Sequence, residues 1–523
     1  MGFAVMKHPP EGVFQHWPRS GVPLVVTDCG QYIPRAERRF SATLAAMAFL
    51  AVAAAMALLY GLWVAWVPLL PSNVFIPLLD LGKLTGYSWA SAILYLLLVV
   101  LLYALYATGY SLIARGKVSL AAVFAVGGLF GFELLWAYPA TAVDVFGYIA
   151  HGRLLALHQV NPFIVAPIEF PSDPILSYLA FPDEPSQYGP VWVLLGGAIT
   201  TLASGDLVKE VLAYKAVGAL AQIGGAALIY LIAACLGAGP LRARASAYLY
   251  LCNPMLLWEM VGNAHNDGVM MLLGLAAVWL FVTGRDRLVL LAAAAGALVK
   301  VPVALVGPAL FVGLWRRARS RAIESALLGL FLAFLVYRPF WEGLQTLTAL
   351  RRSDLFTASV ASVLRLSLEP SLGLTEATTA ARTLSLAGFG ALAVVALWMA
   401  ARAQTEREVL RSAYLTLLGA LLLGTTWFQA WYVVWPFSLG AALGEPRRHL
   451  EVGLLSLGGL LQYFVFIYLW VMGVFPPGEN LGVQAAAYLA IIGPLLVGLA
   501  ARAMQLPLLG SPPGIPSRAW KRS

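Results

Sequence analysis

Residues 89–113, WASAILYLLLVVLLYALYATGYSLI, form an uninterrupted apolar stretch without a single charged side chain. A straight helix needs about 20 apolar residues to cross a bilayer, so this stretch predicts a membrane span. Similar runs recur along all 523 residues, which are 60% hydrophobic and only 11% charged, with a mean hydropathy of +0.80. This leaves too little polar surface for a water-soluble protein, and we predict an all-α polytopic membrane protein.

The other apolar stretches extend this prediction to a bundle of about 12–14 transmembrane helices. Several stretches are too short to cross alone, and we expect half-helices or helices packed inside the bundle. A marginal segment at 191–204 is expected to be an interfacial or re-entrant helix. The stretches lie at 43–69, 89–113, 119–138, 210–236, 245–262, 267–283, 288–300, 303–315, 320–338, 380–402, 409–427, 430–444, 450–474 and 482–503.

The basic residues predict the orientation of this bundle. Of the 34 Lys and Arg residues, 24 fall in segments that can all lie on one side, which the positive-inside rule assigns to the cytoplasm. Both termini of this multi-pass cell-membrane protein are then cytoplasmic. We expect a cytoplasmic arm at 1–40, a transmembrane domain at 41–503 with outer loops at 139–205 and 339–379, and a cytoplasmic tail at 504–523.

The net charge of +9 arises from short basic clusters between apolar runs. Such clusters are the orientation signal of a membrane protein, so we expect contact with membrane lipids and no nucleic acid partner.

Asp144, in AVDVFGYIAHGR (142–153), follows the third predicted span by a few residues. A partly desolvated carboxylate at a water-filled mouth can serve as a general base, although an aspartate here could also cap the next helix. Arg153 on the same helix could bind phosphate, or it could lie at the interface beside solvated His151 and His158. No carboxylate pattern completes a metal site around these histidines, and we propose none.

GNAHND, at 262–267, places polar side chains between two apolar helices. The inside of the bundle offers such groups the cheapest solvation. Asn266 or Asp267 is expected to cap the following helix. Asn263 and His265 then remain to bind hydroxyls or phosphate, or to work with Asp144. Glu259, one turn earlier, is expected to hydrogen-bond within the bundle.

Two basic residues stand beside prolines that break predicted spans. Lys300 precedes Pro302 and Arg338 precedes Pro339. A cation at such a break can balance the charge of a lipid phosphate, or its side chain can reach to the interface. The phosphate interpretation is favoured for Lys300, because the flanking segments are too short to cross the bilayer unbroken. The two interpretations stay equal for Arg338.

Aromatic residues surround one amide in WFQAWYVVWP, at 427–436. Gln429 lies among Trp427, Trp431, Tyr432 and Trp435, and this set predicts sugar recognition, with rings stacking on a hexose and the amide binding its hydroxyls. Tyr188, in QYGP (187–190), could also stack on a sugar, although a tyrosine of the interfacial belt is the commoner outcome.

Four strings carry a resemblance to a known family. They are DVFGYIAHGRLLALHQVNPF (144–163), QYGPVWVLL (187–195), NPMLLWEMVGNAHNDGVMM (253–271) and TTWFQAWYVVWP (425–436). In this order they resemble the bacterial polyprenol-phosphate-mannose-dependent α-1,6-mannosyltransferases, members of the membrane-embedded C-type glycosyltransferases. The resemblance covers about residues 40–500, and NAHND and FQAWY are its most specific parts.

The resemblance implies an inverting enzyme with its active site on the outer membrane face. The donor would be a hexose, here mannose, on polyprenyl phosphate, and the acceptor a hydroxyl of a glycolipid or glycan. Asp144 would be the base, and His265, Asp267 and Gln429 would line the site. No cofactor is implied. Phosphate is already a good leaving group, so one carboxylate suffices where glycosidases need two, and Lys300, Arg338 or Arg153 could supply the positive charge.

The order of the early spans departs from the family pattern. C-type enzymes often place the acid after the first span, whereas Asp144 follows the third, so either two spans precede the core or the early spans are misplaced. A transporter or flippase of lipid-linked saccharides is the alternative function. It should show an internal repeat with matching broken helices, and the sequence shows none.

Overall fold

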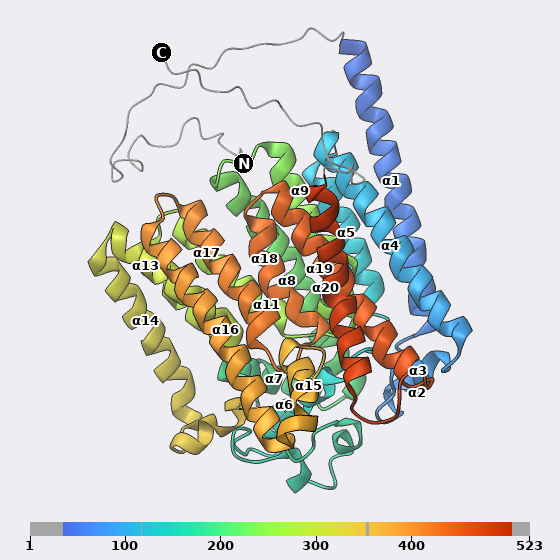
Figure 1. Cartoon of the computed structure of the whole chain (residues 1–523), viewed down its shortest axis with the longest axis vertical. Coiled ribbons are helices and arrows are strands. Elements are labelled where there is room, and N and C mark those ends of the chain that lie inside the picture. Colours follow the sequence, from blue (N-terminus) through green and yellow to red (C-terminus); the bar gives the residue numbers. More distant parts are fainter. Residues whose placement is uncertain (1–34, 117, 352–354, 505–523) are drawn as a thin grey trace.

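The structure is a computed structural model that describes residues 35–116, 118–351 and 355–504. Its regular structure within these ranges is entirely helical, and every predicted apolar stretch overlaps a helix (Figure 1). The all-α prediction is therefore confirmed. The expected arm at 1–40 and tail at 504–523 lie almost entirely outside the described residues.

Three longer helices, α1, α4 and α5, precede Asp144, so this aspartate does follow a third apolar helix. Ser88 and Ser119 begin α4 and α5 as N-caps, because each side-chain oxygen accepts a hydrogen bond from the backbone N–H three residues later. The bounds are α1 (Arg35–Trp66), α2 (Pro71–Val74), α3 (Leu81–Thr85), α4 (Trp89–Arg115) and α5 (Leu120–Leu134).

A pair of short helices, α6 and α7, follows near one end of the bundle (Figure 1). They pack closely because glycines meet at their crossing, where a Cβ on Gly152 would lie only 2.7 Å from the backbone of Gly196. The α7 helix coincides with the marginal segment at 191–204, for which a helix was expected. The elements here are α6 (Asp144–Ala156), η1 (Pro167–Glu169), η2 (Pro174–Tyr178), α7 (Pro190–Ala203) and α8 (Leu207–Cys235).

The next span is broken at GNAHND. The chain bends by 113° between the helical segments Pro254–Gly262 and Asp267–Val282. Lys215, buried in α8, donates to the carbonyls of Leu134, Val261 and Gly262, so it satisfies acceptors that the ends of α5 and η3 leave open. The helices are α9 (Pro240–Leu251), α10 (Pro254–Leu256), η3 (Leu257–Gly262) and α11 (Asp267–Val282).

A second break lies at Lys300, between α12 and η5. These elements are short, as the apolar pattern predicted, and the backbone of Lys300 is extended, with a φ of −157°. This break places the Lys300 side chain among the helices of the bundle, where it is 15% exposed. This region comprises η4 (Asp286–Leu288), α12 (Val289–Ala297), η5 (Val301–Val306), α13 (Gly307–Arg317), α14 (Arg319–Tyr337), η6 (Arg338–Phe340) and η7 (Leu344–Arg351).

In the last part of the chain, residues 434–442 pack against α11 and residues 430–433 against η3, so these segments adjoin the break at GNAHND. An isolated bridge between Thr357 and Trp427 joins the segment before residue 430 to the start of α15. The elements are α15 (Val360–Leu372), α16 (Leu374–Arg402), α17 (Glu406–Gly419), η8 (Ala420–Gly424), η9 (Ala430–Val433), α18 (Val434–Ala442), α19 (Pro446–Tyr463), η10 (Phe464–Trp470) and α20 (Leu481–Ala503).

Seven helical segments of the described chain are long and apolar enough to cross a membrane, or eight if the bent pair at GNAHND forms one span. The number is below the predicted 12–14 because the other apolar stretches form short or interrupted helices. The chain is thus a multi-pass membrane protein. The seven segments are Thr43–Trp66, Trp89–Arg115, Leu207–Cys235, Arg319–Phe340, Leu374–Arg402, Pro446–Trp470 and Leu481–Ala503.

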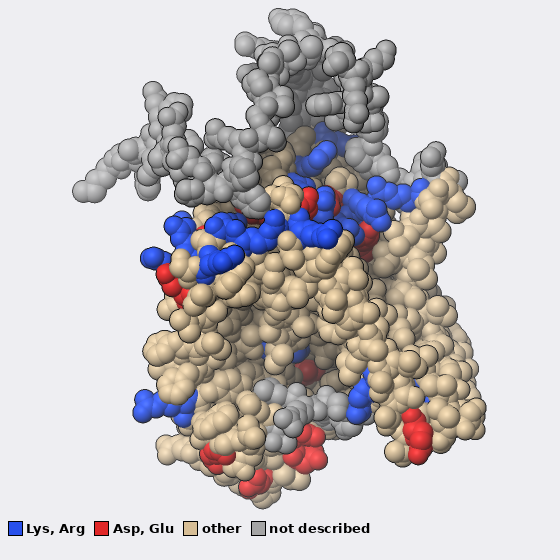
Figure 2. All heavy atoms as spheres, turned by 60° about the vertical axis from the view of Figure 1, so that its left-hand side comes forward, with Lys and Arg blue, Asp and Glu red and all other residues tan. Residues whose placement is uncertain are grey.

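On the face shown in Figure 2, Lys and Arg side chains form a band across one end of the bundle, the end at which α1 begins and α20 finishes (Figure 1). A hollow opens on the surface toward the other end, and both acidic and basic atoms are visible inside it (Figure 2). The basic band and the hollow therefore lie toward opposite ends of the long axis of the molecule.

Candidate active site

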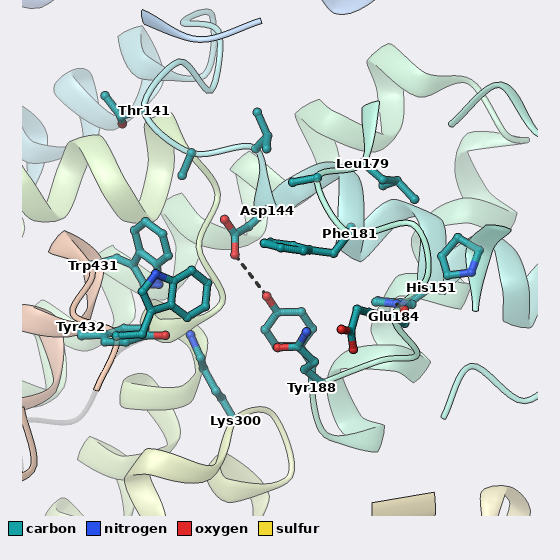
Figure 3. A pocket seen from close by; sticks show the side chains of 17 residues that line it. Thr141, Asp144, His151, Leu179, Phe181, Glu184, Tyr188, Lys300, Trp431 and Tyr432 are labelled. Atoms are coloured by element: carbon teal, nitrogen blue, oxygen red, sulfur yellow. Dashed lines mark hydrogen bonds between the residues drawn. The ribbon is translucent and has the colours of Figure 1, made fainter. Parts of the chain in front are cut away.

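A cavity of about 280 Å³ lies where α6, the loop before α7, the break at Lys300 and the segment 427–432 converge (Figure 3). Five of the predicted site residues line it, although they are far apart in the sequence. These five are Asp144, Tyr188, Lys300, Trp431 and Tyr432.

Asp144 is the first residue of α6. The N-cap position of this helix is occupied by Val143, which makes no side-chain hydrogen bond. Asp144 therefore does not cap the helix, and the capping interpretation is wrong. Instead, Tyr188 donates its hydroxyl hydrogen to Asp144 Oδ1 over 3.2 Å. The carboxylate is only partly buried and faces the cavity (Figure 3), so it remains accessible to a ligand.

In Figure 3, Asp144 and Lys300 lie on opposite sides of the same cavity. Backbone hydrogen bonds fix Tyr188 beside Lys300, since the N–H of Gly189 donates to Val299 O over 3.0 Å. Only glycine fits at position 189, because a Cβ there would collide with the carbonyl of Leu298. The Lys300 ammonium lies 4.9 Å from the ring centre of Tyr432 and 5.9 Å from that of Tyr188, so aromatic faces help to hold it.

Asp267 lies behind Lys300 and is fully buried. Its Oδ2 accepts from Lys300 Nζ over 2.7 Å, and its Oδ1 accepts from the indole N–H of Trp435 over 2.7 Å. Both oxygens are therefore engaged within the protein. Asp267 orients the lysine rather than lining the cavity, and Asn266 is the residue at the N-cap position of α11.

Asn263 and His265 belong to the same buried layer, whereas the sequence suggested that they face a ligand. Asn263 Nδ2 donates to Thr141 Oγ1 over 2.6 Å and to Glu259 Oε2 over 2.9 Å. His265 Nε2 lies 3.2 Å from Glu259 Oε2, and its ring stacks on that of Trp431 with centroids 3.8 Å apart. This layer supports the cavity wall from behind, and Glu259 hydrogen-bonds inside the bundle as expected.

Arg153 does not line the cavity. It is 5% exposed, and its guanidinium donates to Glu210, to Asp173 and to the carbonyl of Gly205. His158 Nε2 completes this cluster, 3.0 Å from Asp173 Oδ2. All three guanidinium nitrogens are engaged, so Arg153 anchors the loop after α6 and is not available for phosphate.

Arg338 and Gln429 also lie outside the set of residues that line the cavity. Arg338 is exposed at the start of η6. Gln429 is partly buried and precedes η9, while Trp427, two residues earlier, does line the cavity. Three of the four rings in the sugar-recognition prediction, Trp427, Trp431 and Tyr432, thus line the cavity, whereas Trp435 and the amide do not.

Thr141, His151 and Glu184 line the cavity without having been predicted to do so. Thr141 accepts from the indole N–H of Trp258 over 3.1 Å as well as from Asn263. His151 Nε2 lies 3.4 Å from the carbonyl oxygen of Glu184. One signal was present for His151, because it lies two turns after Asp144 on one helix. Nothing local marked Thr141 or Glu184.

Burial lowers the pKa of His151 to about 4, and the nearby carbonyl of Glu184 only partly opposes this shift. His151 is therefore neutral in the folded protein at pH 7. An exposed histidine has a pKa of about 6.5, so the unfolded chain binds more protons between about pH 4 and 6.5. Folding stability should then fall as the pH drops through this window. We expect a lower thermal midpoint at pH 5 than at pH 7, and a smaller drop in His151→Gln. An equal drop in both proteins would contradict this assignment.

Comparison with known families agrees with this geometry. Residues 46–317, just over half of the chain, match the sequence model of the family described as alpha-(1->6)-mannopyranosyltransferase, N-terminal domain. This range includes Asp144, Tyr188, Asp267 and Lys300, and therefore most of the cavity except the aromatic segment at 427–432.

Individual relatives carry the same name. Alpha-(1->6)-mannopyranosyltransferase A of Mycobacterium tuberculosis is 24% identical over 381 residues, which cover 67% of this chain and 69% of the relative. Alpha-(1->6)-mannopyranosyltransferase B of Corynebacterium glutamicum is 25% identical over 177 residues, or 33% of this chain and 29% of the relative. The family match over more than half of its length shows that this membrane protein is a glycosyltransferase that belongs to the alpha-(1->6)-mannopyranosyltransferase family.

Proposed function

We propose that the protein transfers a mannosyl group from polyprenyl phosphate to a hydroxyl of a glycolipid or glycan acceptor, with inversion and with Asp144 as general base. One observation carries the proposal: an accessible carboxylate, a single lysine and five aromatic rings share one cavity. The carboxylate suits proton removal, the lysine suits a phosphate, and the rings suit the apolar face of a hexose.

The reaction breaks the bond between the anomeric carbon and the phosphate oxygen of the donor. The acceptor oxygen attacks the anomeric carbon from the opposite face, which inverts its configuration. The acceptor proton passes to Asp144, and polyprenyl phosphate leaves with the bonding electron pair. The donated hydrogen bond from Tyr188 holds the carboxylate in place for this step.

Lys300 is the group suited to the negative charge that gathers on the departing phosphate. An ammonium has three hydrogens, and Asp267 takes one, so others remain for phosphate oxygens. A phosphate needs no protonation to leave, so the reaction does not require a second acid. Glu184 also lines the cavity, and we assign it no role in the transfer.

The distribution of charge supports an orientation for this chemistry. The positive-inside rule would place the basic band of Figure 2 in the cytoplasm and the cavity near the outer face. Both termini would then be cytoplasmic, and the segments 139–205 and 339–379 would lie outside. A donor carried on a membrane lipid could reach the cavity from the outer leaflet.

A transfer assay with purified protein in nanodiscs tests the proposal. We expect label to pass from polyprenyl-phosphate [¹⁴C]mannose to a mannoside acceptor, and much less from the corresponding glucose donor. Nuclear magnetic resonance of the product gives the anomeric configuration. Transfer with retention would exclude the single displacement. No transfer from any donor, together with movement of labelled lipid between leaflets, would favour a flippase instead.

A further inference from the structure

A second hollow, of about 400 Å³, lies beside the first cavity. We name it the α3–η10 groove, because α3 with its flanking residues forms one wall and η10 forms the other. The groove and the cavity share the segment 141–143, which directly precedes Asp144. The two hollows thus meet next to the proposed base. The groove is lined by Leu78, Asp80, Lys83, Tyr87, Ala140, Thr141, Ala142, Val143, Phe466, Ile467, Trp470 and Val471.

One wall of the groove carries charged and polar groups that are already ordered. Asp80 Oδ1 accepts from the hydroxyl of Tyr87 over 3.0 Å and from the backbone N–H of Lys83 over 2.8 Å. The ammonium of Lys83 lies 3.6 Å from Asp80 Oδ2 and donates to the carbonyl of Leu78 over 2.7 Å. The facing wall is apolar and includes the indole of Trp470.

This chemistry fits a saccharide better than a phosphate. The groove holds one carboxylate and one ammonium side by side, so a phosphate near Lys83 would also meet the charge of Asp80. A carboxylate, an ammonium and a phenol can instead bind several sugar hydroxyls, while Trp470 offers a face to the ring. The first cavity differs, because its lysine is paired with a carboxylate that is buried behind it.

The geometry of the transfer places the acceptor on the groove side. Thr141 and Lys300 lie on opposite sides of Asp144 in Figure 3. An inverting attack requires the acceptor hydroxyl and the leaving phosphate on opposite faces of the anomeric carbon. Thr141 already accepts hydrogen bonds from Trp258 and Asn263, so it can offer a ligand its own hydrogen.

We infer that the α3–η10 groove binds the acceptor saccharide and delivers its hydroxyl past Thr141 to Asp144. The inference rests on the proposed function and adds the path of the second substrate. Asp80, Tyr87 and Trp470 should then determine how well the acceptor binds and leave the donor unaffected.

Steady-state kinetics separate the two substrates. Asp80→Asn keeps an oxygen that can cap α3 but loses the charge, and Trp470→Ala removes the ring. With octyl α-mannoside as acceptor, we expect each to raise the KM for acceptor by about tenfold or more, and to change the donor KM by less than about twofold. The matched control is Trp398→Ala, an exposed tryptophan on α16, which should change neither. A higher donor KM, or no change in either KM, would overturn the inference.

A binding measurement without donor keeps this test independent of the proposed function. Octyl α-mannoside should bind wild type and Trp398→Ala alike, and should bind Asp80→Asn and Trp470→Ala about tenfold more weakly. Equal affinity for all the variants, or no binding to wild type, would overturn the groove assignment. If the groove variants bind weakly while wild type transfers no sugar, the groove is supported and the proposed reaction fails.

Discussion

Asp144→Asn should lower kcat for mannosyl transfer by about 10²- to 10⁴-fold, the usual contribution of a positioned general base. Asparagine has nearly the same shape, and its amide oxygen can still accept the hydrogen bond from Tyr188. It cannot take up the proton of the attacking hydroxyl. The KM for donor should change little, because the phosphate contacts lie on the side of Lys300.

The matched control is Asp183→Asn, since Asp183 is an exposed carboxylate in the loop between α6 and α7. It should retain wild-type turnover. Glu184→Gln tests the alternative base, because Glu184 is the other carboxylate that lines the cavity. If Glu184→Gln lost turnover while Asp144→Asn kept it, the role of base would belong to Glu184.

Lys300→Gln should lower kcat by about 10²- to 10³-fold, because the charge on the leaving phosphate would lose its stabilising cation. The same change leaves Asp267 buried without its counter-charge, which typically destabilises a protein by about 3–5 kcal/mol. Loss of activity alone would therefore not separate a chemical effect from partial unfolding.

The double variant Lys300→Gln with Asp267→Asn separates these effects. Removing both charges should restore most of the thermal stability, because no unpaired carboxylate remains. Activity should stay as low as in Lys300→Gln, since the cation is still missing. Turnover, thermal unfolding and donor binding, measured for wild type and both variants, distinguish a chemical role of Lys300 from a structural one. Recovery of turnover in the double variant would mean that Lys300 serves only to neutralise Asp267.

The sequence was most informative where a polar residue interrupted an apolar run beside a helix break. Lys300 was found in this way, and Asp144 was found because it follows the third predicted span by a few residues. The structure brings the two to one cavity. Trp431 and Tyr432 could be predicted because they surround a single amide, whereas Tyr188 was weighed against a tyrosine of the interfacial belt. The helix break at GNAHND followed from its polar run, and the structure shows it as a bend of 113°.

The direction in which buried polar groups face could not be predicted. Asn263, His265 and Asp267 avoid lipid equally well beside water or beside other side chains, and the structure shows that they pair inside the protein. The partners of Arg153 are Asp173 and Glu210, which are 20 and 57 residues away in sequence. Such pairs depend on how the helices pack, and no local pattern records them.

The number of spans was the other feature that packing decided. The apolar runs around Lys300 were found, but their lengths could not show which helices cross the bilayer and which lie within the bundle. Even among the seven candidate spans the surroundings differ, since the windows in Leu374–Arg402 and Pro446–Trp470 are 17% and 56% buried inside the protein. An apolar surface satisfies both lipid and neighbouring helices, so hydropathy alone does not separate them.

The most direct measurement is an experimental structure with a non-transferable phosphonate analogue of polyprenyl-phosphate mannose bound. The phosphonate oxygens should lie within hydrogen-bonding distance of Lys300 Nζ. The anomeric carbon should lie between this group and the carboxylate of Asp144, with Trp431 or Tyr432 against the sugar ring. A phosphonate bound at Lys83 in the α3–η10 groove, or a sugar out of reach of Asp144, would contradict the proposed site.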